Sequence, residues 1–419
     1  SMAKNNYFFP FIMVTSLFFM WGFVHNLDPI LIPHLKKSFS LTNLQSSLVD
    51  SSVFIAYLLM AIPAGLLMKK FGYKSGIITG LLLFSAGSFL FIPAADTGQY
   101  VYFLGALFII ACGLTILETA ANPYVSLLGD PATSTRRLNF AQSFNGLAAT
   151  LAPIIGARVL LTQGASDEEL NAMTESARQV ALAAEAASVK TPYFILGTLI
   201  FAVAILFYFT RLPEIEESDD ETESKNVFQA LRHKNLSWAV VAQFFYVGVQ
   251  VCVFSFFILY AVEVAGIDRV LAADYLGWGC GLAFMIGRFV GVFLMRFISS
   301  EKLLAIYSVI CILLSLLAVF SSGLPAIYAV IGICFFMSIM FPTIFSLGLR
   351  GLGKDTKYGS SLIVMAIVGG AVLPPIFGYI SDLSGSIQYG HIVSVVCFGV
   401  ILLFALYGHR IVKSKTAYE

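Results

Sequence analysis

Three acidic residues interrupt long apolar stretches of this 419-residue chain and are the residues best suited to chemistry. Of its 24 Asp and Glu residues, only Asp28, Asp50 and Glu118 fall clearly inside such stretches. An ionisable group is costly to keep among apolar side chains, so each of these acids is a candidate functional residue. A carboxyl group in such surroundings can carry a proton or accept hydrogen bonds from the hydroxyl groups of a ligand.

Glu118 lies in the middle of the segment GLTILETAANPY, followed by Asn122 and Pro123. We interpret it as a proton carrier or as an acceptor for the hydroxyl groups of a sugar. The alternative is a neutral carboxylic acid that hydrogen-bonds a neighbouring helix.

Asp28 stands beside His25 and Asn26 in the segment WGFVHNLDPILIP. Pro29 and Pro33 remove backbone donors there and loosen the helix. Freed carbonyl groups together with a carboxylate can form a substrate or cation site, as in the broken helices of secondary transporters. Alternatively, Asp28 only caps a disturbed turn of the helix near the outer surface of a membrane.

Asp50 lies in the segment LQSSLVDSSVF, within two turns of the outer end of its apolar stretch. A functional role competes with two other interpretations. The side chain can reach water at the membrane surface, or it can pair with His25.

Polar side chains in two further stretches have the spacing of a helix face. Gln142 and Asn145 stand three residues apart, and both amides can donate and accept hydrogen bonds to sugar hydroxyls or to another helix. A second stripe combines amides with aromatic rings, which suits the polar edge and the C–H face of a sugar ring, although such a stripe also occurs in ordinary helix packing. Its members are Gln243, Tyr246, Gln250 and Phe254.

No cofactor and no metal site are predicted. The six cysteines lie inside apolar stretches without CxxC spacing, and the five histidines are scattered singly. The cysteines therefore resemble small buried apolar residues, and no catalytic dyad or metal cluster indicates an enzyme. A net charge of +1 gives no basic surface for nucleic acid.

The elements that position these residues are predicted to be membrane-spanning helices. The chain is 58% hydrophobic and 12% charged, with a mean hydropathy of +0.86, which excludes a water-soluble globule. A membrane helix needs about 20 apolar residues, and only helices satisfy the backbone economically in lipid. The expected fold is an all-α polytopic membrane protein with twelve helices, at about 7–33, 45–68, 76–94, 100–128, 140–161, 192–212, 238–262, 272–297, 303–320, 326–349, 360–380 and 391–407.

These helices divide into two sets of six, which predicts an N-terminal bundle at 1–212, a linker at 213–236 and a C-terminal bundle at 237–419. The linker carries the acidic run EIEESDDETES and is expected to be cytoplasmic with a short amphipathic helix. Segment 163–190 is expected to be helical on the opposite face. With both termini inside, 18 of the 25 Lys and Arg residues fall on the inner face and five on the outer face. This bias predicts cytoplasmic termini.

The two halves also resemble each other, which is typical of transporters built from repeats. NPYVSLLG at 122–129 corresponds to FPTIFSLG at 341–348, with an offset of 219 residues at the proline. Pro153 and Pro374, in the spans that follow, are 221 residues apart.

Six longer motifs, in order along the chain, show a resemblance to a known family. They are LFFMWGFVHNLDPILIP, IPAGLLMKKFGYKSGIITGL, LETAANPY, RLNFAQSFN, FPTIFSLG and DTKYGSSLIVM. From residue 8 to nearly its C-terminus, the chain resembles the fucose:proton symporter (fucose permease) family of the major facilitator superfamily, with its glucose/galactose and N-acetylglucosamine relatives. The resemblance implies a two-bundle fold with pseudo-symmetric halves, alternating access and cation-coupled sugar uptake.

The resemblance also assigns roles to individual residues. Glu118 falls on the family's acid in span four, which takes part in sugar recognition, and Gln142 and Asn145 fall on polar sugar-binding positions. The family's acid in span one is replaced by Pro29, with Asp28 one residue earlier. One residue turns a side chain by about 100° around a helix. The coupling acid is therefore expected to be Asp28, through a distorted turn, or Asp50, where the fucose permease pattern has an uncharged amide.

The predicted function is import of a monosaccharide, L-fucose or a related hexose, by proton symport. The alternatives are sodium coupling, selectivity for N-acetylglucosamine, glucose or galactose, and a membrane sugar sensor. The expected location is the bacterial inner membrane, where the protein acts as a monomer with a sugar, a cation and lipid as its partners. The predicted sugar-binding residues are Asn26, Glu118, Gln142, Asn145, Gln243, Tyr246, Gln250 and Phe254, and the predicted cation-coupling residues are Asp28, Asp50 and Glu118.

Overall fold

The structure is a computed structural model that describes residues 7–129, 134–161, 164–214, 226–352 and 356–411. These residues form helices and connecting turns, with no β-strand among them. Twelve helical segments of this part are long and apolar enough to cross a membrane, which confirms the predicted number of spans. They are Phe8–Ser38, Asn43–Met68, Tyr73–Thr97, Tyr100–Asn122, Phe140–Leu160, Glu175–Phe209, Lys234–Ser255, Arg269–Leu294, Ser300–Phe320, Leu324–Leu349, Leu362–Ser384 and Ile387–Gly408.

The contacts within the chain divide it into two compact units. Unit 1 comprises Ser1–Glu217 and Ile267–Leu282, and unit 2 comprises Ser218–Gly266 and Ala283–Glu419. Segment Ile267–Leu282 therefore packs with the first six spans, although it belongs to the eighth span along the chain.

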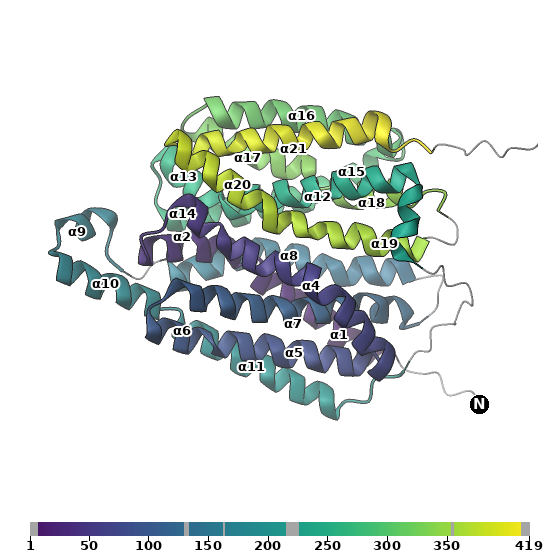
Figure 1. Ribbon diagram of the computed structural model, residues 1–419, viewed down its shortest axis with the longest axis horizontal. Coiled ribbons are helices and arrows are strands. Elements are labelled where there is room, and N and C mark those ends of the chain that lie inside the picture. The colour runs from purple at the N-terminus through teal and green to yellow at the C-terminus, as the bar shows by residue number, and fades with distance from the viewer. Residues whose placement is uncertain (1–6, 130–133, 162–163, 215–225, 353–355, 412–419) are drawn as a thin grey trace, which may run out of the picture. The chain divides into compact units, whose positions relative to one another are not determined.

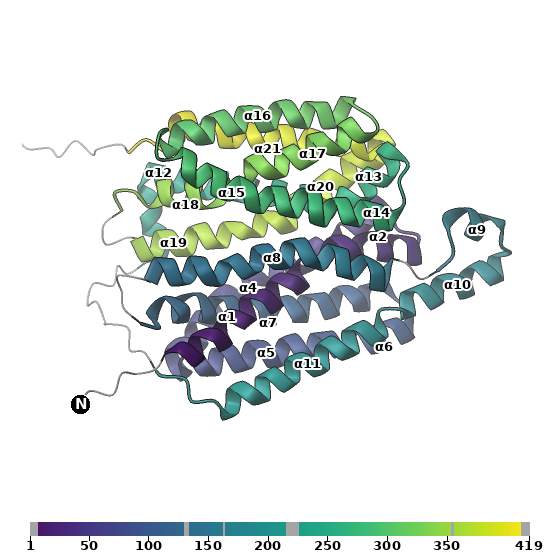
Figure 2. The same cartoon turned by 180° about the vertical axis from the view of Figure 1, so that it is seen from behind.

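Unit 1 is a helix bundle in which α5 packs against α7 and α11, α4 against α7, and α1 against α8 (Figures 1 and 2). A Cβ atom on Gly113 of α7 would lie only 2.5 Å from the backbone nitrogen of Phe84 on α5, so glycine permits this close approach. The helices of the bundle are α1 (Phe8–His25), α2 (Asp28–Ser38), α3 (Asn43–Ser46), α4 (Leu48–Phe71), α5 (Tyr73–Phe89), α6 (Phe91–Thr97), α7 (Tyr100–Leu127), α8 (Ser134–Leu160) and α11 (Lys190–Phe209).

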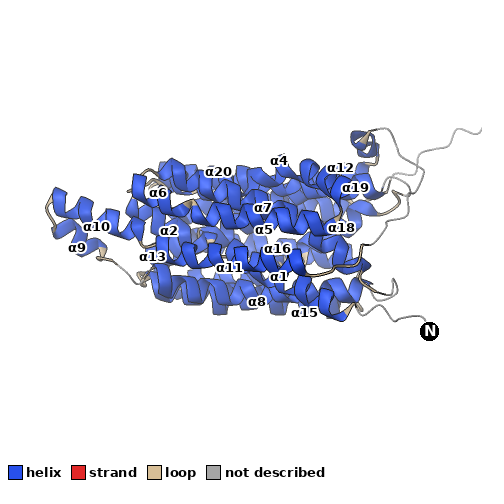
Figure 3. Cartoon of the chain, turned by 90° about the horizontal axis from the view of Figure 1, so that it is seen from below, coloured by secondary structure: helices blue, strands red, loops and turns tan. Residues whose placement is uncertain are grey.

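Two short helices, α9 (Asp167–Ala172) and α10 (Glu175–Ala187), precede α11, as predicted for this hydrophilic segment. Figure 3 shows them extending beyond the other helices at one end of unit 1. The Lys37 ammonium group on α2 pairs with the Glu185 carboxylate on α10 at 2.6 Å, and both side chains are largely buried. This ion pair fixes α10 to the first span.

Helix α14 (Arg269–Asp274) and the π-helix η3 (Tyr275–Gly281) are the part of the eighth span that belongs to unit 1. Both pack against α8. The Arg158 guanidinium group on α8 donates two hydrogen bonds to the Asp274 carboxylate, at 2.7 and 3.1 Å. A Cβ atom on Gly277 would lie 2.6 Å from the carbonyl oxygen of Thr150, so the glycine allows the two backbones to touch.

Unit 2 is built around α12, which packs against α18, α20 and α21, while α16 packs against α17 and α21. Of the predicted linker, residues 215–225 with most of the acidic run lie outside the described residues, and a 3-10 helix occupies Val227–Arg232. The α-helices are α12 (Lys234–Ser255), α13 (Phe257–Ala265), α15 (Leu282–Leu294), α16 (Ser300–Phe320), α17 (Leu324–Met337), α18 (Met340–Leu349), α19 (Thr356–Met365), α20 (Gly369–Ser384) and α21 (Ile392–Leu403). All six cysteines of the chain are buried and free, in agreement with their interpretation as small apolar residues.

Candidate functional site

The first span is broken next to the acid that it carries. Helix α1 ends at His25 and α2 begins at Asp28, with a two-residue turn between them. Pro29 has no amide hydrogen, so the carbonyl group of His25 loses the donor that an unbroken α-helix would supply four residues later. The sequence around the prolines therefore places Asp28 at the first position of a new helix, inside the bundle.

Asp28 and Asp50 are both withdrawn from solvent, with 6% and 0% of their surface exposed. They lie on adjacent helices, α2 and α4, and their charges interact. Two carboxylates that are buried near each other cannot both stay ionised without a large cost. This pair is therefore suited to bind and release a proton. Because Asp50 is fully buried, its side chain does not extend to water in this structure.

Glu118 on α7 is only partly buried and accepts a hydrogen bond from the Tyr57 hydroxyl on α4 at 3.0 Å. The imidazole ring of His25 on α1 meets the ring of Tyr57 edge-on, with ring centroids 6.1 Å apart. The Tyr57 hydroxyl also interacts electrostatically with Asp28. Tyr57 thus stands between the acid of the fourth span and the acid of the first.

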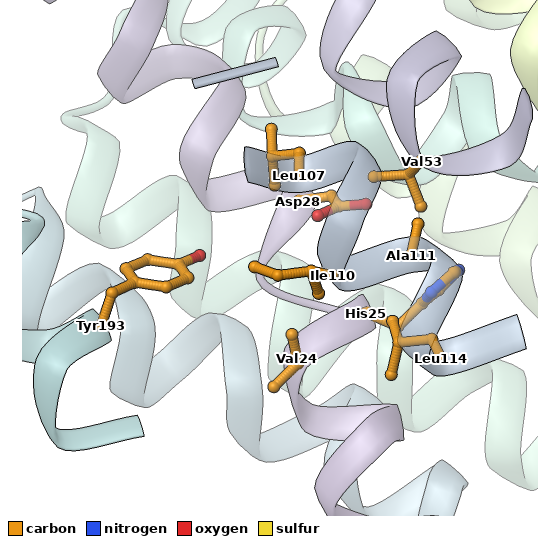
Figure 4. Close-up of a pocket in the computed structure, with 9 residues that line it drawn as sticks. All are labelled: Val24, His25, Asp28, Val53, Leu107, Ile110, Ala111, Leu114 and Tyr193. Atoms are coloured by element: carbon orange, nitrogen blue, oxygen red, sulfur yellow. The ribbon is translucent and has the colours of Figure 1, made fainter. Parts of the chain in front are cut away.

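Asp28 borders a small cavity of about 10 Å³ (Figure 4). This volume matches about one water molecule. The walls come from α1, α2, α4, α7 and α11, and most of the lining side chains are aliphatic. The polar groups at the cavity are His25, Asp28 and Tyr193.

The three predicted amide ligands of unit 1 lie on α8 and at the end of α1. The Asn26 side chain donates to the carbonyl oxygen of Gly22 at 2.7 Å and so ends α1. Asn145 packs on the same glycine, since a Cβ atom on Gly22 would lie 2.2 Å from the Asn145 side-chain oxygen. Gln142, one turn earlier on α8, is exposed. Asn145 and Asn26 are therefore brought together at Gly22, whereas Gln142 points out of this cluster.

The stripe on α12 of unit 2 divides into a buried part and a partly exposed part. Gln243 and Tyr246 are fully buried, and the Gln243 amide donates to the carbonyl oxygen of Phe341 on α18 at 3.1 Å. Gln250 and Phe254 are partly exposed, and Phe254 meets the ring of Phe284 edge-on. Only the second part offers side chains that a ligand can reach within this unit.

Two tyrosines of this region are absent from the residues that the sequence analysis selected. Tyr57 follows Asp50 by seven residues, which places both on one face of α4. That spacing from a candidate acid is a signal that could have identified it. Tyr193 lies near the start of α11, and no feature of the sequence near it indicates that it faces the first span.

A helical membrane protein with acids buried beside a proline-broken span has the design of a secondary transporter. The model of the Major Facilitator Superfamily matches residues 11–357. The chain belongs to this superfamily.

Comparison with individual relatives narrows the assignment within the superfamily. The chain is 41% identical to the L-fucose-proton symporter of Escherichia coli, with 99% of this chain and 95% of the relative covered. It is 40% identical to the glucose/galactose transporter of Brucella abortus, over 97% of this chain and 96% of the relative. The crystal structure of the E. coli fucose:proton symporter FucP matches with a TM-score of 0.71 at 40% identity and covers 97% of this chain and 100% of that one.

Proposed function

We propose that this protein imports a monosaccharide together with a proton by alternating access. Its relatives are named as L-fucose-proton symporters and glucose/galactose transporters, and they match along nearly the whole chain. Bound sugar and bound proton would have to favour the same conformational change, because coupling requires differential binding to the two states.

The observation that carries the proposal is the difference in burial among the acids of unit 1. Glu118 is partly exposed and held by Tyr57, so a ligand hydroxyl can reach its carboxylate. Asp28 and Asp50 are buried and interact with each other. We assign sugar recognition to Glu118 and proton coupling to the Asp28–Asp50 pair. Neutralisation of that pair removes a buried charge and permits the conformational change.

The sugar also receives hydrogen bonds and stacking from neutral side chains in this proposal. The candidates in unit 1 are Asn145, Asn26 and Gln142, and the candidates in unit 2 are Gln250 and Phe254. Gln243 and Tyr246 support the last two through helix packing, because both are buried against α18. L-fucose, D-glucose and D-galactose are all candidate substrates, since the relatives named for them are 41% and 40% identical.

The proposal also covers the oligomeric state of the protein, its membrane and its orientation. The protein acts as a monomer in a bacterial inner membrane, with both termini in the cytoplasm and the linker at 213–236 joining bundles 1–212 and 237–419. The Lys and Arg bias between the predicted loops supports this orientation. Lipid surrounds the exposed apolar side chains of the spans.

Uptake into proteoliposomes tests the proposal. Purified protein is reconstituted and offered labelled L-fucose, D-galactose, D-glucose, D-mannose or N-acetylglucosamine, with a proton gradient, a sodium gradient or none. We expect one or more of these sugars to accumulate only with the proton gradient. Accumulation driven by sodium alone would contradict proton coupling, and the absence of uptake of every sugar would contradict the proposed substrate class.

A further inference from the structure

The cavity beside Asp28 brings together side chains from five helices of unit 1 (Figure 4). Val24, Val53, Leu107 and Ile110 are among the aliphatic groups that line it. A water molecule in such a place needs at least two polar partners. Asp28 supplies a carboxylate from α2, and the second polar group comes from the sixth span.

That second group is the phenol of Tyr193, near the start of α11. Its hydroxyl points toward the region of Asp28 in Figure 4, and both side chains line the same cavity. Its ring is stacked on Phe91 of α6, with centroids 3.8 Å apart and an angle of 8° between the planes. Tyr193 is only 2% exposed, so packing fixes the direction of its hydroxyl. This position is suited to donate a hydrogen bond into the cavity.

We propose that Tyr193 is a positioning residue for proton coupling, whose hydroxyl donates a hydrogen bond to the Asp28 carboxylate through one water molecule held in the cavity. This inference rests on the function proposed above. A donor aimed at the ionised carboxylate stabilises that form and so helps Asp28 to release its proton. The water also gives the proton a hydrogen-bonding partner inside the cavity.

The other groups around Asp28 are compatible with this role. On α4, Asp50 and Tyr57 both interact with Asp28, and on α1 the His25 imidazole also lines the cavity. The residues of α7 at the cavity are aliphatic, and α8 meets this part of α2 through Gly156 at Leu27 and Ile30. Farther along the first span, Lys37 is paired with Glu185, and His34 lies 3.4 Å from the Ser188 hydroxyl. Asp50 is therefore the acid that competes with Asp28 for the proton, and Tyr193 favours its release from Asp28.

Tyr193→Phe removes the hydroxyl and keeps the ring stacked on Phe91, so it tests the proposal in the full-length reconstituted protein. We expect the midpoint of the pH dependence of uptake to rise by about one unit, because Asp28 without its donor holds its proton to higher pH. Sugar exchange at acidic pH, where the site is already protonated, should keep the KM of the unchanged protein. Tyr260→Phe is the matched control, because it removes a buried hydroxyl of unit 2 that donates to the carbonyl oxygen of Ala318. Its pH midpoint should not move.

Infrared difference spectroscopy gives a second readout that does not depend on transport. The carbonyl band of protonated Asp28 is identified as the band that is lost in Asp28→Asn. In Tyr193→Phe this band should titrate at higher pH. An unchanged band titration or an unchanged pH midpoint in Tyr193→Phe would overturn the role of Tyr193, even while proton-driven uptake continues. If the unchanged protein shows no proton-driven uptake, the proposed function fails instead, and the two failures are thereby distinguished.

Discussion

The two units of this protein bury different kinds of polar side chain. In unit 1, the acids Asp28, Asp50 and Glu185 are buried, and Glu118 is partly buried. In the described part of unit 2 no acid is buried, since Glu263 and Asp382 are exposed and Glu301 is only partly buried. The buried polar groups of unit 2 are neutral, among them Asn235, Gln243, His391 and several serines.

The neutral groups of unit 2 mainly satisfy backbone carbonyls. The Asn235 amide donates to the carbonyl oxygens of Leu347 and Arg350 at the end of α18, and Gln243 donates to that of Phe341. A buried amide satisfied in this way stabilises helix packing and carries no charge to change. The buried acids expected to carry the proton chemistry therefore lie in unit 1, while the buried polar groups described in unit 2 are neutral and support helix packing.

The largest expected effect comes from removing an acid of the buried pair. A pH difference of about one unit can drive about tenfold accumulation of a sugar that moves with one proton, because a tenfold ratio costs about 1.4 kcal/mol. Asp28→Asn should abolish this accumulation and leave the sugar at equal concentrations on both sides, with exchange retained. Proteoliposome uptake under a proton gradient measures this accumulation.

Glu263→Gln is the matched control, because it neutralises an exposed acid of unit 2 that accepts a hydrogen bond from the Ile387 amide. Its accumulation should equal that of the unchanged protein. The assignment of proton coupling to unit 1 would be contradicted if Glu263→Gln lost proton-driven accumulation of the sugar. It would also be contradicted if both Asp28→Asn and Asp50→Asn kept this accumulation.

The next effect concerns sugar affinity at the acid of the fourth span. Glu118→Gln keeps the size of the side chain and removes its charge. A hydrogen bond to a charged group contributes about 1.5–3 kcal/mol, so affinity should fall about 10- to 100-fold. Tyr57→Phe should cause a smaller loss, because it removes only the donor that holds Glu118 at 3.0 Å. Equilibrium binding of labelled sugar measures both, and undiminished affinity in Glu118→Gln would exclude it from the sugar site.

The twelve spans and the three acids within them were predictable from the sequence, because mean hydropathy and the cost of charge in lipid act on short segments. The break in the first span was indicated by Pro29 and Pro33, but the position of the turn at 26–27 depends on how α1 and α2 pack. Tyr193 could not be found in this way, because the cavity that it shares with Asp28 is lined by spans that are far apart along the chain. The grouping of Ile267–Leu282 with unit 1 depends likewise on tertiary packing against α8.

A third prediction separates the two parts of the α12 stripe. Gln250→Ala and Phe254→Ala should each lower sugar affinity by about tenfold or less, because one neutral hydrogen bond or ring contact contributes about 1 kcal/mol. Proton-driven accumulation should remain, since neither residue carries charge. Gln243→Leu should instead lower the melting temperature of the protein, because it removes the buried hydrogen bond between the Gln243 amide and the carbonyl group of Phe341. A loss of coupling in Gln250→Ala would show that unit 2 takes part in the proton chemistry.

The smallest expected effect is that of Tyr246→Phe on the same helix. The Tyr246 hydroxyl is buried and has no hydrogen-bond partner within the described residues, and its ring packs near that of Phe341, 6.4 Å away. Removing an unsatisfied buried hydroxyl is nearly neutral or slightly stabilising, because no hydrogen bond is lost. Sugar affinity, accumulation and melting temperature should therefore all stay close to those of the unchanged protein. If affinity fell as far as in Gln250→Ala, the hydroxyl would have to turn toward the sugar during transport, and the division of α12 into a buried and a ligand-facing part would not hold in every state of the protein.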